Sequence, residues 1–185
     1  MNETIKFLVF IVISMGFIWL SRKSICNPKS HGFYRFFSWE IILVLFLLNK
    51  DRWFTNPLRL AQILSWIFLI FSLYLISAGI SAFRKYGKID YHRYDTTLFG
   101  IEKTSALVTV GIYHYIRHPF YSSLLFLGWG IFMKNLTWIG LLLVIINSFL
   151  LLMTAHKEEA ENIQFFGSIY QDYMDKTKRL VPFLF

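Results

Sequence analysis

The sequence predicts an all-α integral membrane helical bundle with about five transmembrane helices, a C-terminal helical hairpin and an interfacial tail helix. Hydrophobic residues make up 56% of the 185 positions, whereas a soluble domain usually contains about 45–50%. Most of them fall in five apolar runs, at roughly residues 5–20, 36–48, 60–82, 120–133 and 136–155. No linker, repeat or low-complexity tract divides the chain, so we expect a single domain over residues 1–185.

The basic residues divide unevenly between the two ends of these predicted helices. With the N-terminus placed outside, the cytoplasmic side receives fourteen of the 19 Lys and Arg residues, and the outer side keeps Lys6, Lys50, Arg52, Arg59 and Lys134. This positive-inside pattern predicts a multi-pass membrane protein with its N-terminus outside and its C-terminus in the cytoplasm. The same pattern accounts for the net charge of +8, so we expect no nucleic-acid partner.

The first three apolar runs predict transmembrane helices within residues 1–82. Ser21-Arg22-Lys23 follows the first run where a small-residue cleavage site would otherwise stand, so we expect a retained anchor rather than a signal peptide. The second run contains Glu40 and is expected to be tilted or only partly inserted. The third run, preceded by Pro57, is the clearest span. Cys26 stands alone, which excludes an intrachain disulfide and a thiolate metal site.

The last two runs predict an antiparallel hairpin. Lys134-Asn135 leaves only a tight turn between them. Asn135 and Thr137 can cap the start of the last helix, and His156-Lys157 mark its end. The polar loop 83–118 is expected on the cytoplasmic side, because unpaired backbone cannot face lipid. Residues 157–178 are expected to form one amphipathic helix along the interface, which can also close over a site.

Two polar clusters flank this hairpin, with Arg117 and His118 before it and Glu158 and Glu159 after it. Charge beside a bilayer is costly, so these residues are candidates for a functional site. Pro119 suits the first position of a helix. The free amides and the positive dipole end of that helix would hold an anionic group, and Arg117 nearby would add positive charge. A ligand with a carboxylate, an ammonium and a ribose, such as S-adenosylmethionine, would engage both clusters. A lipid-phosphate contact for Arg117 and a solvated helix face for one glutamate remain open alternatives.

Other site chemistries find little support in the sequence. His114 and His118 have the i, i+4 spacing of a metal-binding pair, but no acidic residue completes the site, so no metal is expected. The absence of G-x-S-x-G, Walker and G-x-G-x-x-G patterns argues against hydrolase, NTPase and Rossmann-type cofactor functions.

Two stretches of the chain resemble a known family. The first is Leu107-Val108-Thr109-Val110-Gly111-Ile112-Tyr113 followed by Arg117-His118-Pro119-Phe120-Tyr121. The second is Glu158-Glu159, then Phe166-Gly167-Ser168-Ile169-Tyr170-Gln171-Asp172-Tyr173 and Arg179-Leu180-Val181-Pro182. Together they are similar to the isoprenylcysteine carboxyl methyltransferases and membrane phospholipid methyltransferases over about residues 98–185. The resemblance implies an S-adenosylmethionine-dependent membrane methyltransferase, with residues 83–185 as its cofactor-binding catalytic half.

The resemblance also implies roles for particular residues. Leu107, Val108 and Tyr113 would line the adenosyl part of the cofactor, His118, Pro119 and Tyr121 would hold its methionine end, and Gly111 would supply a backbone turn. Glu158 would bind the cofactor from the other side, with Glu159 as a second candidate for that role. Arg117, His118 and Glu158 are the residues expected to be catalytic.

The resemblance leaves the acceptor open, because one position departs from the family pattern. The prenylcysteine enzymes have an arginine four residues before the first glutamate, where this chain has Thr154, with His156 as the nearest basic alternative. We therefore expect a lipid or a lipid-modified small molecule as acceptor, with Thr154 and His156 as candidate substrate residues. Neither the methylated atom nor the oligomeric state follows from the sequence.

Two alternative functions are weighed against methyl transfer. A membrane sterol-type reductase using NADPH shares a related Arg-His-Pro-x-Tyr segment, but such enzymes typically carry Asn before that Tyr, where this chain has Phe120. A non-catalytic membrane subunit would be expected to lose the polar clusters, and both clusters are intact.

Overall fold

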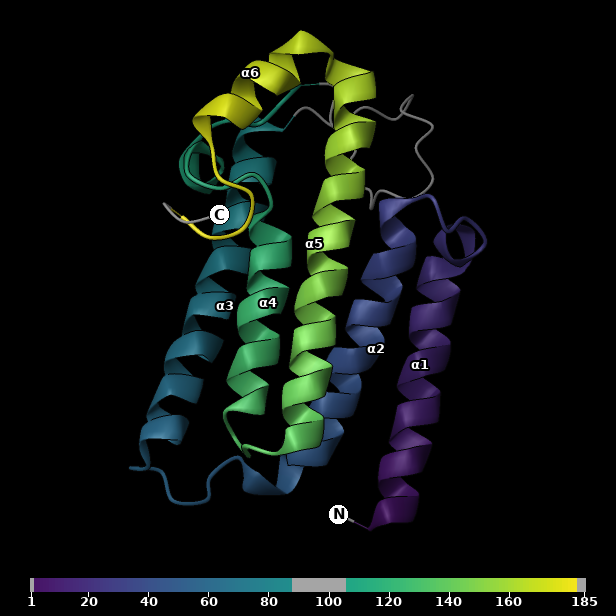
Figure 1. Cartoon of the computed structure of the whole chain (residues 1–185), viewed down its shortest axis with the longest axis vertical. Coiled ribbons are helices and arrows are strands. Elements are labelled where there is room, and N and C mark those ends of the chain that lie inside the picture. The colour runs from purple at the N-terminus through teal and green to yellow at the C-terminus, as the bar shows by residue number, and fades with distance from the viewer. Residues whose placement is uncertain (1, 88–105, 183–185) are drawn as a thin grey trace.

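The described residues of the computed structural model, 2–87 and 106–182, form a bundle of α-helices, which confirms the predicted fold class (Figure 1). Within these residues there is no β-strand, only an isolated parallel bridge between Ile116 and Lys178. The α-helices are α1 (Glu3–Ile25), α2 (His31–Asn49), α3 (Leu60–Tyr86), α4 (Pro119–Phe132), α5 (Trp138–Phe166) and α6 (Ser168–Lys176). Two short 3-10 helices are also described, η1 (Lys50–Arg52) and η3 (Gly111–His114).

Four segments are long and apolar enough to cross a membrane, namely α1, α2 continued through η1, α3 and α5. The apolar helix α4 is shorter, and its 14 residues reach about 21 Å at 1.5 Å per residue. The hydrocarbon core of a bilayer is about 30 Å thick. The chain is therefore a multi-pass membrane protein in which one helix of the bundle is shorter than the others.

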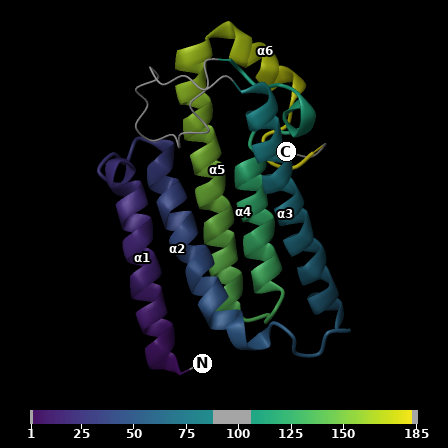
Figure 2. The same cartoon turned by 180° about the vertical axis from the view of Figure 1, so that it is seen from behind.

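The long helices lie side by side in the order α1, α2, α5, α4, α3, as both views of the bundle show (Figures 1 and 2). Accordingly α2 packs against α5, α4 packs against α3, and α1 packs on α2. The core between α2, α4 and α5 contains the buried side chains of Leu45, Ile131, Phe132 and Val144. Because α4 and α5 are joined by a tight turn, the predicted antiparallel hairpin forms the centre of the bundle.

Hydroxyl groups join the helices where lipid offers no hydrogen-bonding partner. Ser38 of α2 donates to Asn147 Oδ1 of α5 over 2.6 Å. Ser65 and Ser72 of α3 donate to carbonyl oxygens of α4, those of Gly130 and Ser123, over 2.6 and 2.7 Å. Interhelical hydrogen bonds of this kind stabilise membrane bundles, where small residues also let backbones approach closely.

Glu40, which made the second span doubtful in the sequence, lies within an uninterrupted helix. Its carboxylate accepts a hydrogen bond of 2.6 Å from Ser14 of α1. Both ends of this interaction lie on the α1–α2 contact, so the acidic side chain finds its partner inside the bundle. The helix α2 runs without a break from His31 to Asn49, and the expectation that it is tilted or only partly inserted in the membrane stays a prediction.

The largest difference from the sequence expectation concerns the end of α5. Thr137 caps this helix as expected, accepting from the backbone N–H of Gly140 over 3.1 Å. However, α5 continues past His156-Lys157 to Phe166, and the single helix expected over 157–178 is wrong. The chain breaks at Gly167, whose φ of +65° is unfavourable for other residues, and α6 follows at a new angle. Only α6 can therefore serve as the expected interfacial tail helix.

The two ends of the bundle differ in charge as the sequence indicates. The N-terminus, the α2–α3 connection and the α4–α5 turn share one end, and α6 and η3 lie at the other (Figure 1). The basic residues of the first end are Lys6, Lys50, Arg52, Arg59 and Lys134. Those described at the second end include Arg22, Lys23, Lys29, Arg84, Lys85, Arg117, Lys176, Lys178 and Arg179. Lys88, Arg93 and Lys103, also assigned to that second side by the sequence, lie outside the described residues.

Candidate functional site

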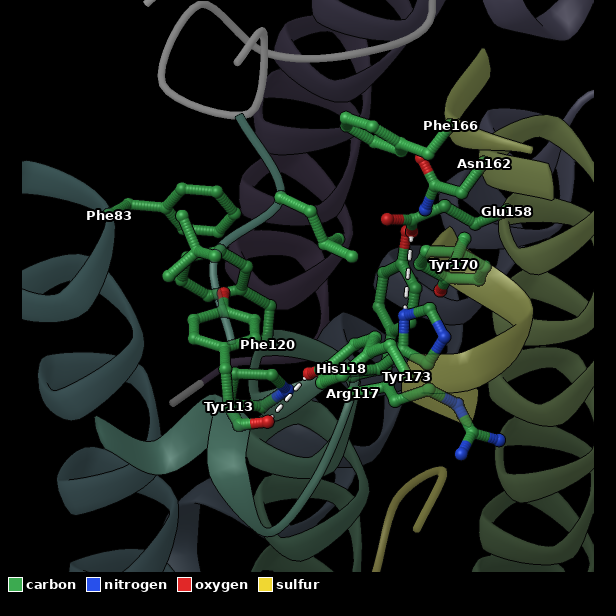
Figure 3. Close-up of a pocket in the computed structure, with 14 residues that line it drawn as sticks. Phe83, Tyr113, Arg117, His118, Phe120, Glu158, Asn162, Phe166, Tyr170 and Tyr173 are labelled. Carbon is green, nitrogen blue, oxygen red and sulfur yellow. Dashed lines mark hydrogen bonds and ion pairs between the residues drawn. The ribbon is translucent and has the colours of Figure 1, made fainter. Parts of the chain in front are cut away.

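A cavity, partly open to solvent, lies at the end of the bundle that carries α6 (Figure 3). Its walls come from the end of α3, the segment 107–113, the start of α4, the last turns of α5, and α6. These pieces are far apart in the sequence and meet only in the folded chain.

One wall of the cavity is aromatic and apolar. Phe83 of α3 stacks on Phe120 of α4 with ring centroids 5.8 Å apart, and it meets Tyr113 edge-on at 5.0 Å. Val108 and Leu107 complete this wall from the segment that precedes η3. Figure 3 shows Phe83, Phe120 and Tyr113 together on one side of the cavity. Such a surface can accept the flat face of an aromatic ligand group.

The opposite wall comes from α5 and α6. Glu158, Asn162 and Phe166 follow each other at i, i+4 and i+8, which places all three on one face of α5 (Figure 3). Tyr170 and Tyr173 of α6 close the wall, and the Tyr173 hydroxyl donates to the Tyr113 carbonyl oxygen over 2.6 Å. Burial raises the pKa of both phenols well above their usual range, so both are neutral donors at ordinary pH.

Between the two walls lies the first turn of α4. The helix begins at Pro119, as the sequence predicts, with His118 as the residue before it. His118 stacks on Tyr121 with ring centroids 5.4 Å apart, and the Tyr121 hydroxyl donates a short hydrogen bond to Glu158 Oε2. His118 Nδ1 lies 3.8 Å from the same oxygen. The fold thus brings together the two polar clusters that the sequence separates by some forty residues.

The neighbouring carboxylate, Glu159, faces away from the cavity into a cluster of cations. Its Oε1 accepts from Arg117 Nε over 2.9 Å, and its Oε2 accepts from Arg179 Nη2 over 2.7 Å. His118 Nε2 lies 3.5 Å from Oε1. Buried charges are tolerated only when they are paired in this way. Glu159 therefore ties α5 to the segments on either side of the site.

The guanidinium group of Arg117 is also bonded to the backbone. Its Nη1 donates to the Met174 carbonyl over 2.9 Å and to the Thr177 carbonyl at the end of α6. The described contacts of this guanidinium thus lie behind the cavity, although the residue contributes to its lining. A contact with lipid phosphates finds no support, since the Arg117 side chain is only 7% exposed.

The segment after α6 is hydrogen-bonded to the outer side of the site. Lys178 and Ile116 form the parallel bridge, and the Arg117 N–H donates to the Lys178 carbonyl over 2.8 Å. Ser122 of α4 donates to the Leu180 carbonyl over 2.5 Å. These bonds fix the backbone on which Arg117 and His118 stand.

A third polar group borders the site from α2. His31 Nδ1 lies 2.5 Å from Glu161 Oε2, and the His31 backbone N–H donates to the other carboxylate oxygen over 3.2 Å. This contact joins the start of α2 to the last turns of α5, three residues after Glu158.

The candidate residues from the sequence divide into two groups. Eight line the cavity, namely Leu107, Val108, Tyr113, Arg117, His118, Pro119, Tyr121 and Glu158. Gly111 forms a turn with φ +66° outside it, and Glu159 lies behind it. Thr154 is fully buried and donates to the Leu150 carbonyl over 2.7 Å, whereas His156 is exposed. Neither Thr154 nor His156 lines the cavity.

Sequence reasoning missed several lining residues. Phe83 was not named, and Phe120 was named only within a motif and not as a site residue, because nothing in a sequence shows that the end of one apolar helix meets the start of another. Asn162 and Phe166 could have been found from their spacing of four and eight residues after Glu158. Among the described residues, no three His, Cys, Asp or Glu side chains cluster so as to hold a metal ion.

Comparison with known proteins identifies the family. The model of the phospholipid methyltransferase family matches residues 60–169, which is more than half of the chain. The match spans α3, η3, α4, the whole of α5 and the first two residues of α6, and with them most of the cavity walls. No curated protein and no solved structure matches the chain. The family match covers more than half of the chain, and the described residues form a membrane bundle. This chain therefore belongs to the phospholipid methyltransferase family and is a membrane methyltransferase.

Proposed function

We propose that the chain transfers a methyl group from S-adenosylmethionine to a lipidic or lipid-modified acceptor, and that it does so in the cavity at the α6 end. One observation carries the proposal most directly. Glu158 stands across the cavity from the wall of Phe83, Tyr113 and Phe120, so that a carboxylate faces an aromatic surface. Membership of the phospholipid methyltransferase family supplies the reaction class.

The residues present fit this cofactor. The aromatic wall with Leu107 and Val108 suits the adenosyl group, whose base presents a flat apolar face. Glu158 can accept hydrogen bonds from ribose hydroxyls or an ammonium group, because a carboxylate is an acceptor on both oxygens. His118, Pro119 and Tyr121 would hold the methionine end at the start of α4, where a helix N-terminus favours a carboxylate.

When bound, the cofactor supplies an already activated methyl group on a sulfonium. The task left to the protein is to position the partners and exclude water, since the chemistry belongs to the cofactor. The buried rings of Tyr113, Tyr121, Tyr170 and Tyr173 serve the second purpose. An amine acceptor would also have to lose a proton, and we assign its removal to His118, the buried imidazole of the cavity wall. A carboxylate acceptor would need no such base.

The acceptor is proposed to be amphipathic because of where the cavity lies. At 29 residues α5 is about 43 Å long, longer than a bilayer core of about 30 Å, and Glu158 belongs to its last turns. A polar head can therefore reach the cavity while an apolar tail stays among the helices. Thr154 supplies no cation at the position of the family arginine, and a prenylcysteine-like acceptor remains a narrower proposal within this class.

We further propose that the α6 end faces the cytoplasm. Most of the basic residues belong to that end, which is the positive-inside pattern. The cytoplasm is also where a soluble nucleoside cofactor would be met.

The cofactor proposal is tested by calorimetric titration of the detergent-purified chain with S-adenosylmethionine. We expect wild-type protein and Asp175→Asn, which removes an exposed carboxylate of α6 away from the cavity, to bind alike. Glu158→Gln keeps the shape of the side chain and should bind at least about tenfold more weakly, as expected for a charge-assisted contact. Equal affinity in all three proteins, or binding of NADPH in place of S-adenosylmethionine, would overturn the proposal. The family match gives the reductase alternative no support.

Acceptor identity requires a separate measurement. Transfer of a labelled methyl group from S-adenosylmethionine to a total lipid extract should yield a labelled lipid with wild-type protein and far less with Glu158→Gln. Label that remains with the protein itself or in the aqueous phase would contradict a lipidic acceptor without touching the cofactor assignment.

A further inference from the structure

A second hollow, partly open to solvent, lies at the end of the bundle opposite the proposed active site. Its walls are the α2–α3 connection, the first turn of α3 and the tight turn between α4 and α5. All three pieces lie at the N-terminal end of the bundle in Figure 1. The cavity with Glu158 and the aromatic wall has no residue in common with this hollow.

Hydrogen bonds fix the walls of the hollow. Gln62, buried in the first turn of α3, donates through Nε2 to the Arg52 carbonyl over 3.0 Å and to the Lys134 carbonyl over 3.3 Å. Asn49 donates to the Ile131 carbonyl over 3.1 Å close by. The loop and the turn are thereby held at a set separation, as a preformed binding site requires.

Lys134 is the chemically unusual residue of this hollow. The residue is only 5% exposed, and its ammonium group lies 3.7 Å from the ring centre of Trp66 and 5.3 Å from that of Trp53. Its Nζ donates to Gln62 Oε1 over 3.2 Å, which is a neutral acceptor. Burial lowers the pKa of Lys134 from its ordinary value. No ion pair joins this ammonium group to a carboxylate within residues 2–87 and 106–182.

The other charges around the hollow are also positive. Arg52 and Arg59 line it, together with the polar side chains of Thr55, Asn56 and Asn135, and no Asp or Glu is among its described lining residues. Asp51, which precedes Arg52 in the sequence, lies 3.1 Å from Lys6 and so is already paired. Three cations therefore surround a polar space without a compensating carboxylate in its lining.

We propose that this hollow binds a phosphate group through Arg52, Arg59 and Lys134. Guanidinium groups match phosphate oxygens in pairs, and a lysine adds a point charge. The chemistry fits two sources, the headgroup of a phospholipid and inorganic phosphate. The headgroup has the closer fit to the surroundings, because Phe54, Leu58, Leu136 and Trp138 are exposed apolar residues beside the hollow at the end of the spans. The proposal is independent of the proposed function, since it concerns the other end of the bundle.

The experiment measures binding of two probes to the full chain in an uncharged detergent, inorganic phosphate and the short-chain lipid dihexanoylphosphatidylglycerol. Tryptophan fluorescence is a suitable readout, because Trp53 and Trp66 lie against Lys134. The test variant is Arg52→Gln/Arg59→Gln, both positions being exposed. The matched control is Lys23→Gln/Arg84→Gln, which removes two exposed charges at the other end.

We expect wild-type protein and the control to bind at least one probe with equal affinity, and the test variant to bind it at least about tenfold more weakly. Binding of the lipid alone assigns the site to a phospholipid headgroup. Binding of inorganic phosphate alone assigns it to the free anion, and binding of both probes assigns it to either source of phosphate. Lys134→Gln should show the same loss if it remains folded. Equal affinity in wild type, control and test variant, or no binding of either probe to wild type, would overturn the proposal.

Discussion

Arg117 and Glu159 form an ion pair, 2.8 Å from Nη2 to Oε1, in which the two side chains are only 7% and 2% exposed. The pair joins the segment that leads into α4 to the last turns of α5. Arg179 approaches the same carboxylate from the tail over 2.7 Å, with its side chain 25% exposed. One carboxylate therefore holds three parts of the chain around the cavity.

Removing the charge of Glu159 should lower the free energy of unfolding. Glu159→Gln leaves two guanidinium groups without their counter-charge, and breaking a buried pair in this way costs about 3–5 kcal/mol. Arg179→Gln should cost less, because that side chain is partly exposed. Unfolding in detergent by chemical denaturant measures both. A loss for Glu159→Gln no larger than that for Arg179→Gln would contradict the structural role.

Gly111 is expected to tolerate no side chain without strain. Its φ of +66° lies in the left-handed region, which costs an L-residue about 1–2 kcal/mol. Space is not the obstacle, since an added Cβ would meet only Ala82 Cβ at 3.7 Å. Gly111→Ala should therefore lower the free energy of unfolding by that amount. Gly16→Ala in α1, where nothing lies within 4 Å, is the control and should leave stability unchanged or slightly raised. Equal effects at the two positions would rule out the strain.

The protein is expected to lose stability in alkaline solution because of the buried phenols of Tyr170 and Tyr173. Burial raises the pKa of each phenol above its ordinary value of 10.0. Below about pH 10 the phenols are neutral in both folded and unfolded chains, so their contribution is constant. Above it the unfolded chain releases protons first, and stability falls by up to about 1.4 kcal/mol per pH unit for each phenol.

The comparison is between wild type and Tyr170→Phe/Tyr173→Phe, each unfolded at a series of pH values from 7 to 11. The double variant loses the hydrogen bond to the Tyr113 carbonyl, so it should be less stable at neutral pH. Its further decline above pH 10 should be shallower than that of wild type. Parallel curves would show that these phenols do not titrate differently on unfolding.

Cys26 provides a test of membrane orientation. It is the single cysteine of the chain, it is exposed, and it follows α1 at the α6 end of the bundle. If that end faces the cytoplasm, a membrane-impermeant maleimide should label Cys26 in inverted vesicles and leave it unlabelled in right-side-out vesicles. Leu58→Cys in a Cys26→Ser background, at the exposed α2–α3 connection, should give the reverse. Labelling of both positions from one side would contradict the predicted orientation.

Most of the fold could be predicted from hydropathy, but one helix end could not. The starts of α4 and α5 follow from Pro119 and Thr137, which act through local backbone chemistry. The end of α5 does not follow from polarity, because a helix continues through polar residues such as His156 when its backbone bonds remain satisfied. Gly167, with its positive φ, ends the helix, and the apolar run ends far earlier.

The site was predictable only in its polar parts. His118 and Glu158 stand out in the sequence because charged and polar side chains are scarce beside apolar helices. Their meeting depends on the antiparallel packing of α4 and α5, which the short turn between them also predicts. The aromatic wall and the pairing of Glu159 with Arg179 depend on contacts between distant segments, for which one sequence holds no local mark.

The unbroken course of α5 from Trp138 to Phe166 has a mechanical consequence. One rigid rod carries both the lipid-facing residues and the carboxylate of Glu158, so a tilt at one end is transmitted to the other. Bilayers of different thickness impose different tilts on a long helix. Since Phe83 and Phe120 belong to other helices, such a tilt would change the width of the cavity between them and Glu158. We therefore expect lipid chain length to influence the dimensions of the proposed site.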